Sequence, residues 1–416
     1  MEIETIEYGI ESELGQLKAD AHRLKLNKET KYDSRLQFYE KTASRERFKS
    51  DNFRELELNF STDMSMRNAA IRLNRLRREN KGIIPTTLRN NIEREGTLIQ
   101  REKEKLATKA LLSNGFNSHA EIIQPEQFIQ DEAKYIQAEI VQKAAESKNI
   151  KRFEVTDYES AENAVNISID DVFTKRQSEM RPKDESKEQA KRVSNTVIHV
   201  QRGEHKHIVN AESIPSAIKL LIGLLLNSDL LSKQLVFFTD GARDIHSWVI
   251  KLFSFTNYKI VLDWYHLRKK CQEQLSMILN GSKVRNEFLE KLLPYLWFGN
   301  VNGAIKVLKE LNPKQIRNQE LLVKLIEYLG RVQNYIPNYA LRKELGLRNS
   351  SNLGEKSNDL LVASRQKHNG MSWSDDGSLA FATVAAVCFN NELQQYIHEG
   401  TVSLKFPTAI KNAIAA

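Results

Sequence analysis

Aspartates that follow short apolar runs are the residues of this chain with the clearest chemical potential. The run Asn166–Ile169 stops on Asp170 and Asp171, and the run Gln234–Phe238 leads to Asp240. Open α/β sheets bind ligands at the carboxyl ends of their strands. A carboxylate there either caps the next helix or holds a divalent cation, and a single one is more often a cap. Two on neighbouring strands favour a pair of Mg²⁺ or Mn²⁺ ions, an arrangement suited to phosphodiester chemistry.

A third carboxylate is needed to complete such a site. Glu355 is a candidate, because the segment that begins at Ser350 has helical caps and a helical pattern of apolar residues. The alternative is that Glu355 is an ordinary first-turn acid, favoured there by the helix dipole. On spacing alone Glu355 is no better a candidate than Glu344 or Glu392.

The aspartates must be positioned by the elements around them, which alternate between strand and helix. Apolar runs and turn residues predict the following order: strand 166–169, hairpin strands 196–200 and 205–209, helix 217–231, strand 234–238, helix 242–253, and strand 258–262 ending in Asp263. This order is that of an RNase H-like core. The fold class expected is therefore α/β, mostly helical overall, because the residues from 263 to about 348 return to a helical period.

Residues 1–150 show charged, helix-period patterns with little strand signal. Within them, residues 65–97 predict one helix, a break around Gly82, and a second helix that opens at Pro85 and ends near Gly96, which is a helix-turn-helix pattern. Its second helix carries donors suited to phosphates and base edges in the major groove: Thr86, Thr87, Arg89, Asn90 and Arg94. The alternative is a plain pair of scaffold helices.

Positive charge is concentrated in two stretches. The chain has 62 Lys and Arg against 54 Asp and Glu, a net charge of +8. Residues 65–105 hold eleven Lys/Arg and five Glu, and residues 268–348 hold fifteen Lys/Arg and seven Glu. Two basic helical segments around a more acidic middle predict two surfaces for one polyanion. Solvated helix faces are the alternative for either segment taken alone.

Several classes of protein are excluded by composition. The longest apolar run, 217–226, is too short to span a bilayer, and the acidic start of the chain lacks the apolar region of a secretory signal. Two cysteines, Cys271 and Cys388, cannot form a Cys-rich zinc site or a disulfide framework. We therefore expect a cytoplasmic protein with no membrane partner.

Several motifs together resemble the DDE transposases of bacterial insertion sequences. The resemblance extends over roughly residues 65 to 396. Its stretches are ISIDDVFTKRQ (167–177), VFFTDGARDIHSWV (236–249), VLDWYHLRKK (261–270), and SRQKHNGMSWSDDGS (364–378) downstream of Glu355. Within the third stretch, Asp263 and His266 look like the Asp/Cys-x-x-His signature shared with Mutator-like transposases.

The resemblance implies an enzyme that binds terminal repeats and catalyses metal-dependent DNA cleavage and strand transfer. Asp170, Asp240 and Glu355 would be the catalytic and metal-binding residues, and Asp263, His266 and Arg365 accessory ones. The family pattern allows a one-residue slip from Asp170 to Asp171. It further implies a helical DNA-binding region in 1–150, a catalytic domain in 160–266 plus 350–400, a basic helical insertion in 267–349, and a homodimer or larger assembly on the terminal repeats and target DNA.

Three rival interpretations remain open at this point. The chain could be a catalytically inactive DNA-binding relative, although all three carboxylates stand in their motifs. It could be a structure-specific RNase H-like nuclease, although the basic insertion and the helix-turn-helix favour recognition of DNA ends. A helical scaffold protein without a nucleic acid partner would leave the strand-end carboxylates unexplained.

Overall fold

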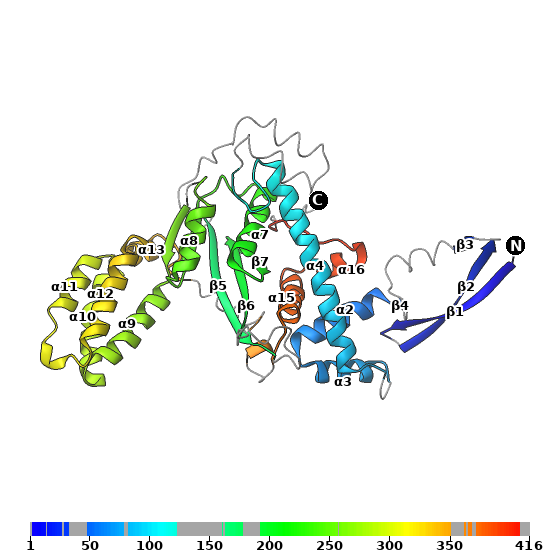
Figure 1. The fold of residues 1–416 in the computed structure, drawn as a ribbon, viewed down its shortest axis with the longest axis horizontal. Helices are drawn as coiled ribbons and strands as arrows, with labels where there is room; N and C mark the ends of the chain where they lie inside the picture. Colours follow the sequence, from blue (N-terminus) through cyan, green and yellow to red (C-terminus); the bar gives the residue numbers. More distant parts are fainter. Residues whose placement is uncertain are drawn as a thin grey trace, which may run out of the picture.

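The computed structural model describes residues 2–13, 15–26, 29–32, 48–78, 82–122, 160, 163–177, 192–256, 258–350, 362, 365–367 and 372–407. A mixed sheet of five strands stands between two groups of helices (Figure 1). Its strands and the two helices between them are β5 (Val165–Lys175), β6 (Arg192–Arg202), β7 (His205–Ala211), α7 (Ile214–Asn227), β8 (Leu235–Thr239), α8 (Arg243–Leu252) and β9 (Tyr258–Leu262).

The helical groups lie at opposite ends of this sheet (Figure 1). One consists of α2 (Asp51–Asp63), α3 (Met66–Leu76), α4 (Pro85–Ser113), α15 (Asp375–Phe389) and α16 (Leu393–Glu399). The other follows β9 and consists of α9 (Trp264–Ile278), α10 (Ser282–Trp297), α11 (Val301–Lys309), η2 (Pro313–Gln315), α12 (Gln319–Val332), η3 (Gln333–Tyr335) and α13 (Tyr339–Glu344). The prediction of a mostly helical α/β chain is confirmed.

The strands lie in the order β7-β6-β5-β8-β9, or 3-2-1-4-5 when they are numbered along the chain. The first three pair antiparallel, and β5, β8 and β9 pair parallel. The hairpin between β6 and β7 turns at Gly203, whose φ of +55° is one that a glycine adopts without strain. The sequence therefore predicted this order of strands and helices correctly.

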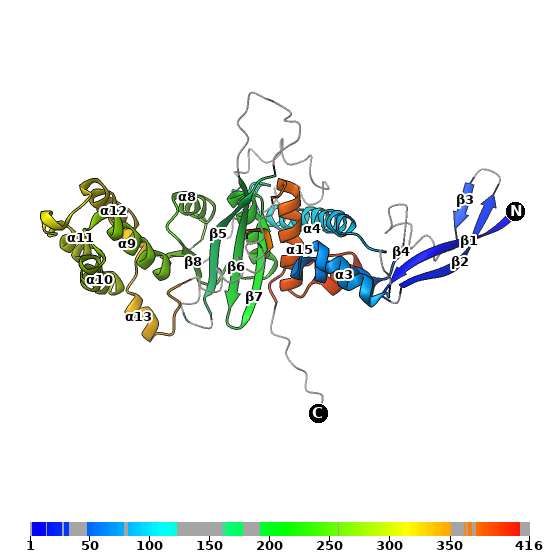
Figure 2. The same cartoon turned by 90° about the horizontal axis from the view of Figure 1, so that it is seen from below.

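Each face of the sheet is covered by different helices. On one face, α7, α8 and the second half of α4 bury alternate strand residues such as Ile167 and Phe237. On the other face α15 covers Val172 and Val197, while α9–α13 cover Val261 and its neighbours at the β8–β9 side. The second face is thus shared between two helical groups, with α9–α13 beyond the β8 side and α15 beside β6 and β7 (Figure 2).

The beginning of the chain contradicts the prediction of helix throughout residues 1–150. β1 (Glu2–Ser12), β2 (Gly15–Leu26), β3 (Glu29–Tyr32) and β4 (Phe48–Lys49) form a four-stranded sheet of order β3-β2-β1-β4. In β1, apolar Ile3, Ile6, Tyr8 and Ile10 are interspersed with glutamates. A largely alternating pattern of this kind is typical of a strand. The many charged residues favoured the prediction of a helix instead.

The predicted pair of helices is present, but its second member is longer than expected. α3 begins after the cap Ser65 and α4 begins at Pro85, as predicted, whereas α4 continues past Gly96 to Ser113. Gly96 does not end the helix, because it serves as the contact with α15: a Cβ there would lie 2.2 Å from the carbonyl oxygen of Ala380. Tertiary packing thus explains this glycine.

A further element differs from its predicted bounds. β5 does not stop at Asp170 and Asp171 but runs on to Lys175, because its second half pairs with β6 along its whole length. The last helical region is divided into α15 and α16, with Asn391 in the left-handed region at φ +59° between them. Among the described residues, no helix combines the length and the apolar character needed to cross a bilayer.

Candidate functional site

Asp170 and Asp240 follow the paired parts of two neighbouring parallel strands. The pairing of β5 with β8 ends at Ser168 opposite Phe238, and two residues further along the chain come Asp170, still within β5, and Asp240, just after β8. Asp240 is exposed in the loop after β8, where its Oδ1 accepts the backbone N–H of Ala242 at 2.8 Å. Asp240 therefore shapes the turn into α8 through one oxygen while it stands at the strand end.

Asp171 lies on the opposite face of β5 from Asp170, because successive strand residues alternate. Asp171 shares a hydrogen bond with the Thr196 hydroxyl on β6. Burial raises the pKa of the Asp171 carboxyl, the Thr196 hydrogen bond lowers it, and the nearby charges of Asp240 and Asp244 raise it further. Asp171 is therefore electrostatically coupled to Asp240, whereas Asp170 lies on the face that Val172 shares with α15.

Glu355 lies outside the described residues, but the chain on either side of it is hydrogen-bonded to the start of α9 and to the end of β5. Before it, the Asn349 carbonyl accepts the backbone N–H of Trp264 at 3.0 Å, at the start of α9. After it, the backbone N–H of Trp373 donates to the Lys175 carbonyl at the end of β5 at 2.9 Å. Both anchors belong to elements that carry the predicted site.

Arg365, predicted as an accessory residue, is buried between helices. Its guanidinium lies 5.3 Å from the ring centroid of Phe381 on α15, and its Nη2 donates to the Ser61 carbonyl of α2 at 3.4 Å. Burial lowers the pKa of Arg365. Its contacts join the segment after Glu355 to the α2 helix and do not include Asp240.

Asp263 and His266 occupy the first turn of α9. Asp263 is fully buried, and its Oδ1 caps the helix by accepting the backbone N–H of His266 at 3.0 Å. The His266 Nδ1 lies 3.4 Å from the same oxygen. Asp263 is thus the N-cap of α9. The imidazole of His266, in contrast, is one-third exposed and lines a cleft with Asp240.

This cleft has a volume of about 410 Å³ and lies between the loop after β8 and the helices α9 and α12. We call it the cationic cleft. It is lined by Asp240, Gly241, Ala242, Arg243, His266, Lys269, Lys270, Glu273, Tyr328 and Arg331. Lys269 and Lys270 belong to the stretch VLDWYHLRKK, but the sequence did not identify Tyr328 and Arg331, which come from a helix about sixty residues later. Only the packing of α12 against α9 brings them to Asp240.

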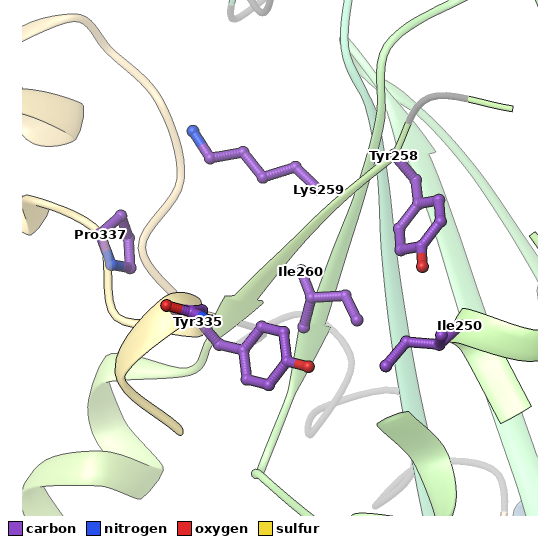
Figure 3. A pocket seen from close by; sticks show the side chains of 7 residues that line it. Ile250, Tyr258, Lys259, Ile260, Tyr335 and Pro337 are labelled. Atoms are coloured by element: carbon purple, nitrogen blue, oxygen red, sulfur yellow. The ribbon is translucent and has the colours of Figure 1, made fainter. Parts of the chain in front are cut away.

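A second hollow, of about 460 Å³, lies beside β9 and has a different lining. Figure 3 shows Ile260 pointing toward Ile250, with Tyr335 nearby, and Lys259 pointing away toward the side of Pro337. The rest of its lining is Tyr258 and Asn334. No described residue of this lining is a carboxylate, so it offers no acidic metal ligand.

The predicted DNA-binding residues lie near the start of α4. Thr86, Thr87, Arg89, Asn90 and Arg94 are all exposed. Arg89 Nε lies 3.7 Å from Glu93, and Arg94 Nη2 lies 2.9 Å from Glu95. The turn before α4 is held by Asn74, whose side chain donates to the Ile83 carbonyl and accepts its N–H, both at 2.8 Å. The α3–α4 pair is therefore a fixed unit with an accessible helix start.

No family model, curated protein or solved structure matches this chain. The described part of the chain also holds no group of three or more His, Cys, Asp or Glu side chains placed to bind a metal ion. What can be said about function therefore comes from the residues and their geometry.

Proposed function

We propose that this chain is a DDE-type transposase of a bacterial insertion sequence, which cleaves and joins DNA strands through Asp170, Asp240 and Glu355. The observation that carries the proposal is that Asp170 on β5 and Asp240 just after β8 each lie two residues beyond Ser168 and Phe238, the last paired residues of these parallel strands, in a sheet ordered 3-2-1-4-5. This is the strand order of an RNase H-like core, with the aspartates where ligands of such sheets bind. The anchors of the segment around Glu355 at Asn349 and Trp373 support its membership of the same site.

The carboxylates around Asp240 fit a divalent cation. Burial is the main cause of the raised pKa of Asp171, and the charges of Asp240 and Asp244 add to it, which supports a gathering of negative charge at this strand end. Asp170, Asp240 and Glu355 would hold two Mg²⁺ or Mn²⁺ ions, because oxygen ligands suit both metals. When bound, such a pair supplies activation of a water or 3′-hydroxyl nucleophile and stabilisation of the leaving oxygen.

The remaining residues would bind and orient the DNA. The exposed start of α4 would contact the terminal repeats through Thr86, Thr87, Arg89, Asn90 and Arg94. Asp263 fixes the first turn of α9, so that His266 faces the cleft beside Asp240 and can donate a hydrogen bond to a phosphate oxygen. Target DNA and a second copy of the chain would be the partners. An inactive relative and a structure-specific nuclease remain the alternatives.

The test is cleavage of DNA that carries the flanks of this chain's own gene, in the presence of Mg²⁺. Asp170→Asn, Asp240→Asn and Glu355→Gln should each abolish cleavage and leave DNA binding nearly intact. Asp229→Asn is the matched control, since Asp229 is exposed with φ +52°, a conformation that asparagine also adopts. Full cleavage by the Asp240 variant would refute the proposal. Loss of activity in Asp171→Asn but not in Asp170→Asn would move the first catalytic residue to the other face of β5.

His266 can be tested separately. His266→Ala should slow strand transfer by about 10²-fold, a low-end value for acid–base or electrostatic assistance, without lowering the melting temperature or the affinity for DNA ends. A variant that unfolds several degrees earlier, and whose folded fraction cleaves at the normal rate, would make His266 a residue of the packed core.

A further inference from the structure

The cationic cleft gathers four basic side chains from three helices beside Asp240. Arg243 comes from α8, Lys269 and Lys270 from α9, and Arg331 from α12. All four side chains are exposed. Among the described residues of the lining, Asp240 and Glu273 are the acidic ones. Within the part of the chain that the structure describes, none of the four cations forms an ion pair with a carboxylate. Like charges held together in this way favour an anionic partner.

The cleft is held in shape by Tyr328. Two of the cations contact its ring, with Lys270 Nζ 5.8 Å and the Arg331 guanidinium 5.4 Å from the ring centroid. Its hydroxyl lies under the loop that carries Asp240, since a Cβ on Gly241 would be 3.0 Å from this oxygen. Gly241 has φ +88°, so glycine suits both the backbone and the contact. Tyr328 therefore links the position of the cations to that of Asp240.

The helices α9 and α12, which carry three of the cations, are packed together by their apolar faces. Leu267 and Cys271 of α9 and Leu329 of α12 are fully buried in one apolar cluster, which continues into Val236 and Phe238 of β8. The cations thus project from a rigid base shared with the strand that leads to Asp240. Because the backbone that carries these cations is already fixed, it loses little conformational freedom when a polyanion binds. Such a cleft can hold the polyanion in one defined position.

We propose that the cationic cleft binds the DNA backbone phosphates adjoining the scissile phosphate, through Lys269, Lys270 and Arg331, and so positions the reacting bond at Asp240. This inference rests on the proposed function. Arginine and lysine around a cleft of this size suit phosphodiester oxygens, because guanidinium groups bind them in pairs and ammonium groups act as point charges. The helices α9–α13 are then part of the substrate site and not only a spacer.

The first experiment measures how DNA affinity depends on salt. The variant Lys269→Gln/Lys270→Gln/Arg331→Gln should make the slope of log affinity against log salt shallower by about two to three, since each phosphate contact contributes about 0.9. The control Lys283→Gln/Lys291→Gln/Lys309→Gln removes the same charge from exposed positions of α10 and α11, outside the cleft. The control should keep the wild-type slope. Equal slopes for all three proteins, or equal losses in both variants, would overturn the inference.

The second experiment locates the contact on the DNA. A set of substrates is prepared, each with one neutral methylphosphonate at one of three positions on either side of the scissile bond. The cleavage rate of each substrate is measured for the wild type and for both variants. Wild type and control should be slowed roughly 10-fold or more at one to three of these positions, and the cleft variant should not be slowed further there. Additive losses would show that these phosphates bind elsewhere.

These outcomes are separable from failure of the proposed function. If the wild type cleaves no DNA in any metal and Asp240→Asn changes nothing, the proposed function fails. If the wild type cleaves and the cleft variant keeps both its salt slope and its methylphosphonate pattern, only the inference fails. Binding of inorganic phosphate by the cleft, without either DNA effect, would make it an anion site unrelated to the reaction and would overturn the inference.

Discussion

The two ends of the central sheet are joined to their helices by different chemistry. At the β9 end, the helices α9–α13 meet the strands through apolar and aromatic side chains. At the β7 end, the helices α4, α15 and α16 meet the strands partly through buried polar and charged side chains. We call the first the aromatic junction, represented by Trp264, Trp297 and Tyr339. We call the second the polar junction, formed by Lys103, His207, Asn390 and Glu392.

The aromatic junction consists of rings in mutual contact. The centroid of Trp264 lies 4.8 Å from that of Trp297 and 5.0 Å from that of Tyr339. Tyr339 is fully buried, and its hydroxyl donates to the Leu262 carbonyl at the end of β9 at 2.7 Å. Burial raises the pKa of Tyr339, so the phenol stays neutral and remains a donor. Hydrophobic contact therefore dominates this junction, and the Tyr339 hydroxyl links α13 to the end of β9.

The polar junction places charged groups where water is excluded. Lys103 Nζ lies 3.9 Å from Oε2 of Glu392, and His207 Nδ1 lies 3.9 Å from Oε1 of the same carboxylate. Burial lowers the pKa of Lys103 and raises that of Glu392. Asn390 accepts from the N–H of Ile208 at 2.8 Å and donates to its carbonyl at 2.9 Å, which satisfies the edge of β7. This junction therefore combines specific hydrogen bonds with a cost of desolvation.

The difference indicates what each junction contributes. Buried ion pairs add little net stability, because desolvation opposes their attraction, but they disfavour any other alignment of the partners. Apolar contacts stabilise strongly and depend little on pH. We infer that the aromatic junction supplies stability for α9–α13, and that the polar junction specifies how the α4 helix is placed on the sheet and makes that placement sensitive to pH.

The largest expected effect comes from breaking the aromatic junction. Tyr339→Ala should lower the free energy of unfolding by about 3–5 kcal/mol, because a fully buried ring is removed from a packed site. Tyr339→Phe should cost only about 1–2 kcal/mol, the loss of one buried hydrogen bond. Urea denaturation followed by circular dichroism at pH 6 and pH 8 measures both. A cost for Tyr339→Ala that changes strongly between the two pH values would contradict the assignment.

An intermediate effect should appear at the polar junction when the pH is lowered. Burial, with help from Lys103 and His199, lowers the pKa of His207 to about 3, whereas an unfolded histidine titrates near 6.5. Between these two pKa values His207 is protonated in the unfolded chain but not in the folded one. The free energy of unfolding therefore falls as the pH drops from about 6.5 toward 3. The slope for this residue is up to about 1.4 kcal/mol per pH unit.

His207→Gln should remove this share of the pH dependence. His199, whose pKa burial lowers to about 4, is present in both proteins, so the difference between wild type and variant isolates His207. The exposed His119, changed to Gln, is the control and should leave the slope unaltered. Parallel curves of stability against pH for wild type and His207→Gln would show that this histidine does not resist protonation.

The smallest expected effect is a pair of glycine substitutions with opposite signs. Gly96→Ala should destabilise by about 1–3 kcal/mol, since the added methyl would overlap the backbone of Ala380 and push α4 away from α15. Gly330→Ala, on an open surface of α12, should stabilise by up to about 1 kcal/mol through helix propensity alone. Midpoints of thermal unfolding compare the two. Stabilisation by both would mean that α4 and α15 approach less closely than described.

The elements that the sequence predicted well are those whose local signals agree with their packing. The β9 strand, the β6–β7 hairpin and the start of α3 at its Ser65 cap all carry such signals. The errors lie where tertiary contacts override local ones. Gly96 suggests a helix end in isolation but is a packing contact, and Asp170 suggests a strand end although pairing with β6 carries β5 past it.

The candidate site was predictable only in part for the same reason. Asp240 follows an apolar strand and precedes a helix, so its place at the strand end could be inferred from the sequence. Whether Asp170 or Asp171 lies on the same face of the sheet as Asp240 depends on which β5 residues face which side. The apolar run alone does not fix this, because β5 extends beyond it. The burial of Arg365 beside Phe381 and Ser61 depends on helices that the sequence did not place together.

The sequence by itself determined the alternation of strands and helices along the chain and the place of Asp240 after a strand, because period, turn residues and apolar runs act over a few neighbouring residues. Only the tertiary structure decided which distant side chains surround Asp240. Tyr328 and Arg331 reach it from α12 because apolar residues on another side of that helix are buried against α9 and β8. Burial of one helix face fixes where the opposite face points, and no local pattern contains that information.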